Sequence, residues 1–163
     1  MDTIQFKPIG IIHSPFTDPV GTPIQPTGAK GIKGTIEIFP EYAEALTDLA
    51  GFSHIIVLFH LHLSRGFSLK TKPFLDNTPR GLFATRSPNR PNPIGLSVVK
   101  LDRIEATTLY ISNVDIVDGT PLLDIKPYVP DFEPNEMENI RIGWLTGKSP
   151  RVRNKKSDQR FSK

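Results

Sequence analysis

Proline is the residue that most constrains this chain: sixteen prolines are spread over 163 residues, about twice the usual share of roughly 5%. Because proline fixes φ and lacks a backbone N–H, it is excluded from helix interiors and from central strands. Only residues 40–51 keep apolar side chains at helical spacing, between Pro40 and Gly51. The sequence therefore predicts short strands joined by stiff, Pro-rich loops, with one short helix.

Residues 35–39 alternate with a period of two, which is typical of a half-buried strand, whereas residues 54–63 form an expected strand too apolar to face water on both sides. Segments 96–104 and 107–117 are separated only by Glu105-Ala106, which predicts a hairpin. The expected strands are residues 4–6 with 9–12, 35–39, 54–63, 81–85, 96–104, 107–117 and 122–125, and residues 140–145 form either a last strand or a docking segment. This pattern predicts a mainly β fold, a closed or nearly closed barrel.

Composition and charge exclude several classes of protein. The chain has no cysteine, which rules out disulfides, Cys-zinc sites and thiol catalysis. No apolar run approaches the roughly 18 residues that span a membrane, so we expect a soluble, cytoplasmic protein without membrane contact. Residues 148–163 hold seven Lys or Arg and a single acid, whereas residues 1–147 are net negative. We therefore expect a barrel domain over 1–147 and a flexible basic tail over 148–163 that contacts phosphates.

The segment from Arg86 to Ser97 (RSPNRPNPIGLS) is the most unusual part of the sequence. Three prolines stiffen it, so its two arginines sit on a backbone with little freedom, which lowers the entropy cost of binding a partner. Gly95, inside an expected strand, indicates a bulge or a close approach of the backbone. A Pro-rich surface loop with solvated arginines is the alternative interpretation.

His60 and His62 share one face of the expected strand 54–63 and could chelate a metal ion. No third ligand stands nearby in the sequence, so we expect buried, hydrogen-bonded histidines at a pocket rim and no metal. The sequence lacks a Gly-x-Gly-x-x-Gly motif, a phosphate-binding Gly-Lys-Ser/Thr loop and a Gly-x-Ser-x-Gly elbow. The remaining candidates are polar loops of the kind that build small-molecule sites at barrel rims.

Several of these loops together closely resemble the TsaA-like, or TrmO, family of tRNA methyltransferases. The matching motifs are FATRSP at 83–88, RPNPIGLS at 90–97, DGTP at 118–121, DIKPY at 124–128, Ile9-Gly10, HSP at 13–15, Gln25-Pro26 and FSH at 52–54. They occur in order over roughly residues 6–132. The resemblance implies a single-sheeted β-barrel, assembled as a homodimer, that binds S-adenosylmethionine. It also implies N6-methylation of threonylcarbamoyl-adenosine adjacent to the anticodon of tRNA.

The resemblance also implies a set of site residues. The cofactor would contact Gln25, Pro26, Thr27, Leu61, His62, Arg86, Leu96, Asp118, Gly119, Thr120 and Pro121. Some members of the family have glycine where Thr27 stands. The substrate would contact Arg90, Asn92 and Lys126, with an arginine as bidentate partner of the threonyl carboxylate or a phosphate. Because the methylated nitrogen must lose a proton, we expect Asp124 or Tyr128 to act as the base or to orient the acceptor.

Two alternative functions remain open at this point. One is a methyltransferase of the same fold that acts on another RNA or on a small molecule. The other is a non-enzymatic barrel that binds nucleic acid through its basic tail. Under the methyltransferase interpretation, deleting residues 148–163 is predicted to weaken tRNA binding and to leave cofactor binding intact.

Overall fold

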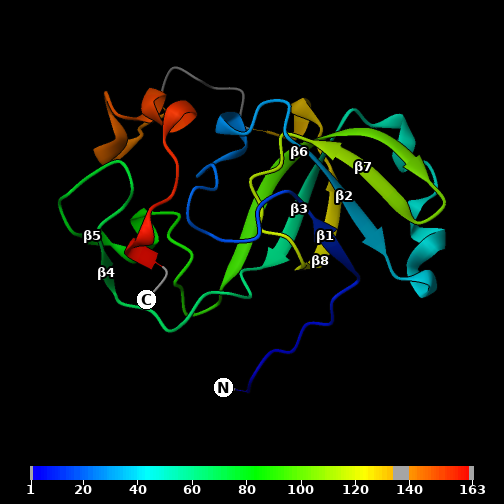
Figure 1. Ribbon diagram of the computed structural model, residues 1–163, viewed down its shortest axis with the longest axis horizontal. Helices are drawn as coiled ribbons and strands as arrows, with labels where there is room; N and C mark the ends of the chain where they lie inside the picture. The colour runs from blue at the N-terminus through cyan, green and yellow to red at the C-terminus, as the bar shows by residue number, and fades with distance from the viewer. Residues whose placement is uncertain (1, 134–139, 162–163) are drawn as a thin grey trace.

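The computed structural model describes residues 2–133 and 140–161 (Figure 1). Within them, six antiparallel strands close a barrel in the order β1-β2-β7-β6-β3-β8. These strands are β1 (Gly10–His13), β2 (Lys33–Ile38), β3 (His54–His60), β6 (Ile94–Glu105), β7 (Thr108–Ser112) and β8 (Thr120–Pro127). A separate ribbon pairs β4 (Lys70–Thr71) with β5 (Arg80–Gly81). The prediction of a mainly β, single-sheeted barrel is confirmed.

The barrel interior is filled by the inward side chains of each strand. On β3 the inward residues Ile55, Val57 and Phe59 are buried, while the alternate positions are half-buried or exposed. They pack with Ile12, Ile36, Val99, Leu109, Ile111 and Leu122 in one core cluster. Burial of these side chains supplies the main driving force for closing the barrel.

Gly95 allows β3 and β6 to pack closely, as its place in the sequence suggested. It pairs with Phe59, and a Cβ at position 95 would collide with the ring of Phe59. A register shift between Leu58 and Phe59, where β3 pairs β8, bends the strand at the same end of the barrel. Glycine and bulge together let the chain leave the barrel here and line a cavity.

The expected helix over residues 40–51 is a different structure. The structure has two 3-10 helices, η2 (Pro40–Leu46) and η3 (Leu49–Gly51), separated by Asp48 with a left-handed φ of 66°. The Thr47 hydroxyl and amide both bond the carbonyl of Glu44, three residues earlier, so the chain turns before an α-helical ladder forms. Tyr42, Leu46 and Leu49, the apolar residues at helical spacing in this segment, are partly buried and pack against the core.

Several strand boundaries also differ from the prediction. Residues 4–6 form no strand, because Ile4 and Phe6 are 77% and 64% exposed and their segment leaves the barrel (Figure 1). Residues 81–85 form the end of β5 and the 3-10 helix η4 (Leu82–Ala84) instead of one strand. β7 ends at Ser112, and the hairpin turn lies at Ala106-Thr107.

The remaining short elements lie outside the strands of the barrel. They are the 3-10 helices η1 (Pro26–Gly28), η5 (Pro130–Phe132), η7 (Gly143–Leu145), η8 (Ser149–Asn154) and η9 (Gln159–Phe161). Residues 140–145 act as a docking segment, since the Trp144 indole donates to the carbonyl of Ala84 at 2.8 Å. No helix among the described residues has the length and apolar character needed to cross a membrane.

Candidate functional site

A cavity of about 440 Å³ opens at the end of the barrel where β3 finishes and β6 begins. This volume lies within the range of roughly 300–1,000 Å³ that is usual for small-molecule sites. Its floor comes from inward barrel residues, including Phe59, Gly95 and Ser97. Its rim comes from residues 19–25, 61–64, 85–90 and 157–161, which we call the collar.

Many of the residues that the family resemblance implied for the cofactor meet in this cavity. Gln25, Leu61, His62, Arg86, Leu96 and Thr120 line it, and so does Arg90. They come from five separate parts of the chain, which only the closed barrel brings together. The cofactor role of these residues stays a prediction, and their convergence on one cavity supports it.

Arg86 and Gln25 join the two sides of the collar. The Arg86 guanidinium donates to Gln25 Oε1 at 2.6 Å, although 61 positions separate them in sequence. Gln25 stands just before η1, where Pro26 begins the helix. Because Arg86 is exposed at the rim and has further N–H donors, it can bind an anionic group while keeping this bond.

Arg90 organises the Pro-rich loop itself. Its Nη1 donates to the carbonyl oxygens of Thr85 at 2.9 Å and Ser87 at 3.4 Å, and its guanidinium lies 5.8 Å from the centre of the Phe83 ring. Beside it, the Ser64 hydroxyl lies 3.0 Å from the Asn89 side chain. Among the described residues, the buried hydroxyl of Ser87 has no hydrogen-bond partner. The loop is thus a built structure and not a solvated surface turn.

His62 is the histidine of the strand end that reaches the cavity. Its Nδ1 lies 3.4 Å from Thr120 Oγ1, whose hydroxyl donates to the carbonyl of Val117, so the ring nitrogen is placed to donate. Burial lowers the pKa of His62, and repulsion from His60 adds to this. His62 is therefore mainly neutral at neutral pH. His60 is exposed, contrary to the expectation that both histidines are buried, and the described residues contain no group of three metal-ligating side chains.

Asp115 is a cavity residue that the sequence analysis missed. It lines the floor of the cavity, and Ser97 on β6 donates to its Oδ1 at 2.8 Å. Burial raises the pKa of this carboxyl to about 6, against the opposing effects of the Ser97 bond and the Arg86 charge. The available signal was Ser97, a polar residue at an inward position of an otherwise apolar strand, which requires a polar partner.

Other predicted site residues lie outside this cavity. Asp118 accepts from the Ser14 amide at 3.0 Å and from His13 Nδ1 at 3.2 Å, and the Ser14 bond above all lowers its pKa. Gly119, with φ of 74°, completes the turn into β8, as its sequence predicted. In this chain the turn fastens β8 to the end of β1. The residues predicted for the cofactor that do not line the cavity are Pro26, Thr27, Asp118, Gly119 and Pro121.

The predicted catalytic residues occupy another face. Asp124 pairs with Lys126 at 2.8 Å, and both lie on β8 opposite outward residues of β3. Tyr128 packs its ring edge on His54, 6.4 Å between centres. Asn92 is an exposed residue of the Pro-rich loop itself. Within one chain, Asn92, Asp124, Lys126 and Tyr128 do not reach the cavity, and their roles stay predictions.

The C-terminal segment forms one wall of the cavity. Ser157 exchanges backbone bonds with Gly21 and Thr22, both at 2.9 Å, and the Phe161 ring meets Phe74 edge-on at 4.9 Å. Arg160 donates to the carbonyl of Pro73 at 2.6 Å. The division of the chain after residue 147 stays a prediction. Residues 156–161, which we call the strap, contact the collar and residues 73–74 through these backbone and side-chain interactions.

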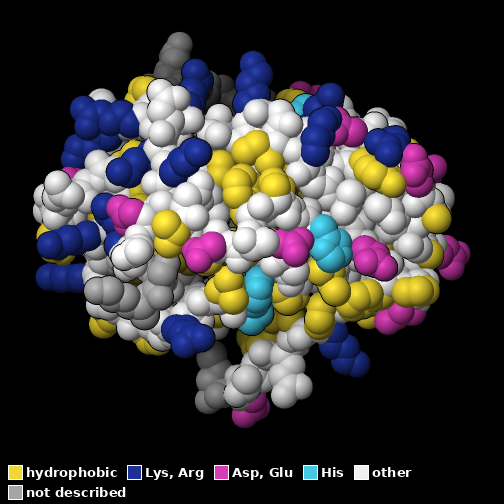
Figure 2. All heavy atoms as spheres, viewed as in Figure 1, with side chains coloured by type: hydrophobic (Ala, Val, Ile, Leu, Met, Phe, Trp, Pro, Cys, Tyr) yellow, Lys and Arg dark blue, Asp and Glu magenta, His cyan; other side chains and the backbone are white. Residues whose placement is uncertain are grey.

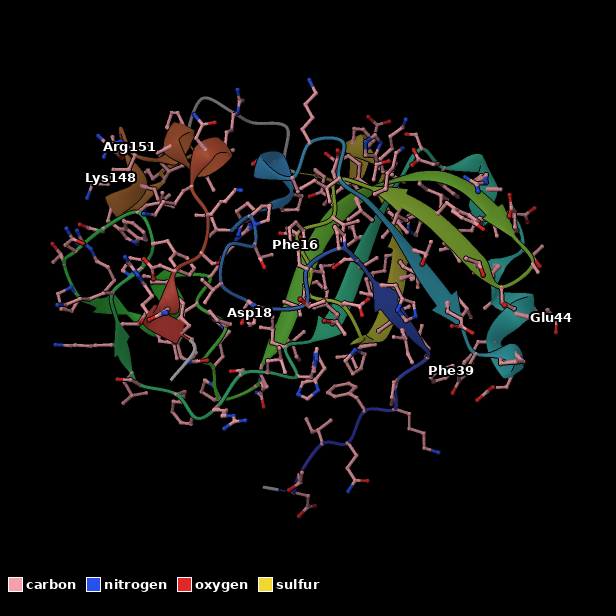
Figure 3. The ribbon with its side chains drawn as sticks, viewed as in Figure 1. Phe16, Asp18, Phe39, Glu44, Lys148 and Arg151 are labelled. Carbon is pink, nitrogen blue, oxygen red and sulfur yellow. The ribbon has the colours of Figure 1, made fainter. Side chains whose placement is uncertain are left out.

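Basic side chains gather on the side of the molecule that carries this segment (Figure 2). Lys148, just before η8, and Arg151, within η8, lie together, whereas Glu44 of η2 lies at the opposite end of the molecule (Figure 3). Asp76 anchors the segment, since it accepts from Arg80 at 2.6 Å and Lys148 at 3.0 Å. These two bonds lower the pKa of Asp76 strongly.

A closed barrel with a partly apolar, polar-rimmed cavity at one end defines a small-molecule-binding barrel. The model of the tRNA-methyltransferase O N-terminal domain matches residues 11–134. The chain belongs to this family, and a relative from Pseudomonas aeruginosa, 45% identical over 78% of this chain and 58% of its own length, is named "Putative S-adenosylmethionine-dependent methyltransferase RcsF". The family resemblance is therefore confirmed.

Individual relatives agree with this assignment. A probable S-adenosyl-L-methionine-binding protein of Pyrococcus abyssi is 51% identical over 97% of this chain and 85% of its own length. The tRNA (adenine(37)-N6)-methyltransferase of Escherichia coli is 39% identical over 82% of this chain and 61% of its own. The crystal structure of TrmO from Pseudomonas aeruginosa superposes with a TM-score of 0.70 at 39% identity, over 88% of this chain and 63% of that one. The chain thus spans less than two thirds of the last two proteins.

Proposed function

We propose that this chain is an S-adenosylmethionine-dependent methyltransferase that modifies N6 of threonylcarbamoyl-adenosine adjacent to the anticodon of tRNA. The observation that carries the proposal is the cavity, which collects six cofactor residues implied by the family from five parts of the chain. Relatives named for S-adenosyl-L-methionine binding and for adenine N6-methylation of tRNA support it.

The cavity suits the chemistry of methyl transfer. The methyl carbon leaves the sulfonium sulfur as its bond to nitrogen forms, the sulfur keeps the electron pair as a thioether, and the nitrogen loses its proton. Such an in-line displacement depends on positioning and on a site poor in water. Leu61 and Leu96 supply apolar surface to the cofactor, while Gln25, Arg86 and Thr120 supply polar contacts.

The basic side of the molecule is the surface that we propose for tRNA. The Trp144 ring lies there beside Arg80 and Lys148, whose charged groups are 5.5 Å and 6.0 Å from its centre. Enzymes that modify a base in single-stranded RNA usually bind the phosphates with basic groups while the unstacked base enters a pocket. Because the same segment walls the cavity, bound tRNA would lie close to the cofactor.

A cytoplasmic homodimer is the assembly that we propose from the family resemblance. The outer face of β3 offers apolar surface for such a contact at the half-buried, outward residues Ile56 and Leu58. Asp124 and Lys126 lie on the adjoining face of β8. Dimerisation would bring this face of one copy against the other, so light scattering of the purified protein tests the proposal directly.

Methyl transfer to two matched tRNAs tests the proposed reaction. The tRNAs share one sequence, and only one carries the threonylcarbamoyl group. We expect methyl incorporation into that one alone, read by mass spectrometry of its nucleosides. Methylation of the unmodified tRNA or of a small molecule would favour the first alternative, a different substrate. Cofactor-independent tRNA binding without methylation would favour the non-enzymatic barrel.

The same assay tests the proposed base. If Asp124 or Tyr128 accepts the proton, Asp124→Asn or Tyr128→Phe lowers the transfer rate by about 10²-fold or more while S-adenosylmethionine still binds. Wild-type rates in both variants would contradict a role for either residue in the proton transfer.

A further inference from the structure

Asp115 differs from the other charged side chains around the cavity. Asp158 is paired with Arg160 at 2.7 Å, and Arg90 is bonded to backbone carbonyls. Within the described parts of the chain, Asp115 lines the cavity without a basic side chain at ion-pair distance. A carboxylate in this position has a charge that the protein alone leaves uncompensated.

The environment of Asp115 leaves one of its oxygens available. Ser97 is 3% exposed and donates to Oδ1, which fixes the plane of the carboxylate. Among the described residues, Ser97 is the one other side chain that hydrogen-bonds this carboxylate, and it bonds Oδ1. Asp115 is half-buried and lines the cavity, so a ligand in the cavity can reach its Oδ2 atom.

Arg86 completes the arrangement from the rim. Its charge acts on the Asp115 carboxyl and opposes the rise in pKa, so guanidinium and carboxylate are within electrostatic reach of each other. Gln25 holds the guanidinium through a single bond of 2.6 Å. The cavity therefore presents a cation at its rim and an anion on its floor, and among the described residues no ion pair joins the two.

A free α-amino acid end has the complementary pair of charges, a carboxylate next to an ammonium group. We propose that Arg86 and Asp115 together bind the amino-acid end of the cofactor, with the ammonium group on Asp115 Oδ2 and the carboxylate on Arg86. Ser97 is the positioning residue that orients Asp115. The inference rests on the proposed function, because it assigns a place to one part of S-adenosylmethionine.

Three ligands distinguish a direct contact of Asp115 with the amino-acid end from a general disturbance of the cavity. S-adenosylmethionine and S-adenosylhomocysteine both carry the amino-acid end, whereas 5′-methylthioadenosine lacks it. Calorimetric titration of each ligand into the purified protein gives their affinities. Asp115→Asn is nearly isosteric and its amide oxygen still accepts from Ser97, so it removes the charge and leaves the hydrogen bond.

We expect Asp115→Asn to weaken both ligands with the amino-acid end by about ten- to a hundredfold, because a bond between two charged groups is lost. The affinity for 5′-methylthioadenosine should stay within about twofold, which also shows that the cavity is intact. Arg86→Ala should give the same pattern. Asp131→Asn, an exposed carboxylate outside the cavity, is the matched control and should change none of the three.

Two results would overturn the inference. Unchanged binding of S-adenosylmethionine by Asp115→Asn would remove Asp115 from the contact. An equal loss for all three ligands would make its role structural. Failure of the wild-type protein to bind S-adenosylmethionine would instead count against the proposed function, so the two failures are distinguishable.

Discussion

The barrel wall and the collar are held together by different kinds of interaction. The wall consists of ladder hydrogen bonds between strands and a core of apolar side chains that are almost completely buried. The collar consists of polar bonds between segments far apart in sequence. Examples are Arg86 with Gln25, 61 positions apart, and Ser157 with Thr22, 135 positions apart.

This difference separates stability from binding. Apolar burial in the wall contributes the free energy of folding, because it removes a large apolar area from water. Contacts in the collar are partly exposed, so each contributes little to stability, yet together they fix the shape of the cavity. Substitutions in the wall should therefore change folding, and substitutions in the collar should change ligand binding.

The largest expected effect is in the wall. Leu122 is fully buried at the centre of the barrel, where β8 pairs with both β1 and β3. Leu122→Ala should lower the free energy of unfolding by about 2–5 kcal/mol, through lost burial and the cavity left behind. Urea denaturation measures this loss. The same change in the collar, Leu63→Ala at a side chain 46% exposed, should cost under about 0.5 kcal/mol. Similar losses in both variants would remove the distinction between wall and collar.

A smaller effect is expected from removing the strap. Deleting residues 156–163 takes away Ser157, Asp158 and Phe161 from the cavity wall. We expect S-adenosylmethionine to bind about tenfold more weakly, since the collar residues 19–25 lose their partner, with little change in urea denaturation of the barrel. This reverses the sequence-based prediction that the tail is dispensable for the cofactor.

A variant that removes positive charge but keeps the backbone is the control for that deletion. The double variant Lys155→Gln, Lys156→Gln keeps the strap backbone and removes two positive charges. It should bind the cofactor like the wild type and bind tRNA more weakly, most clearly at low salt. Cofactor affinity that falls equally in the double variant would show that the deletion acts through electrostatics and not through the wall.

The barrel could be predicted from the sequence because its signals are local. The period-two alternation in β2, the turn at Asp118-Gly119 and the glycine at position 95 each depend on neighbouring residues and a repeating geometry. The prediction of one helix over residues 40–51 was wrong, because the spacing of apolar residues carries no information about a single left-handed residue such as Asp48. The structure has two short 3-10 helices there. Boundaries failed where hydrogen bonds from other segments decide them.

The cavity could be predicted only in part. The motifs supplied Arg86, Leu96 and His62, but Asp115 lies in a stretch that alternates like a strand and carries no motif of its own. The strap was missed because high charge in residues 148–163 is typical of solvated chain ends, while its contacts depend on Phe161, Ser157 and backbone groups. Contacts over more than 100 positions leave no local pattern to read.

The smallest expected effect is a pH dependence that Asp115 introduces into stability. Its pKa in the folded protein is about 6, above the ordinary value of 3.8, so the folded state holds this proton more tightly than the unfolded chain. The wild type should therefore lose stability relative to Asp115→Asn as pH rises from about 4 to about 6, and the difference should level off above that range. The groups that face Asp115 are Arg86 and Ser97, and neither titrates in this range.

Urea denaturation of both proteins at pH 4, 5, 6 and 7 measures this difference and cancels the acid effects of the other carboxylates. Asp102, whose pKa the Ser112 bond and two lysines lower to about 2, acts equally in both proteins. A difference that is flat with pH would mean that the Asp115 carboxyl is well solvated. A difference that follows the expected direction, and shrinks when S-adenosylmethionine is added, would show that the floor of the cavity holds an unfavourable charge that the ligand neutralises.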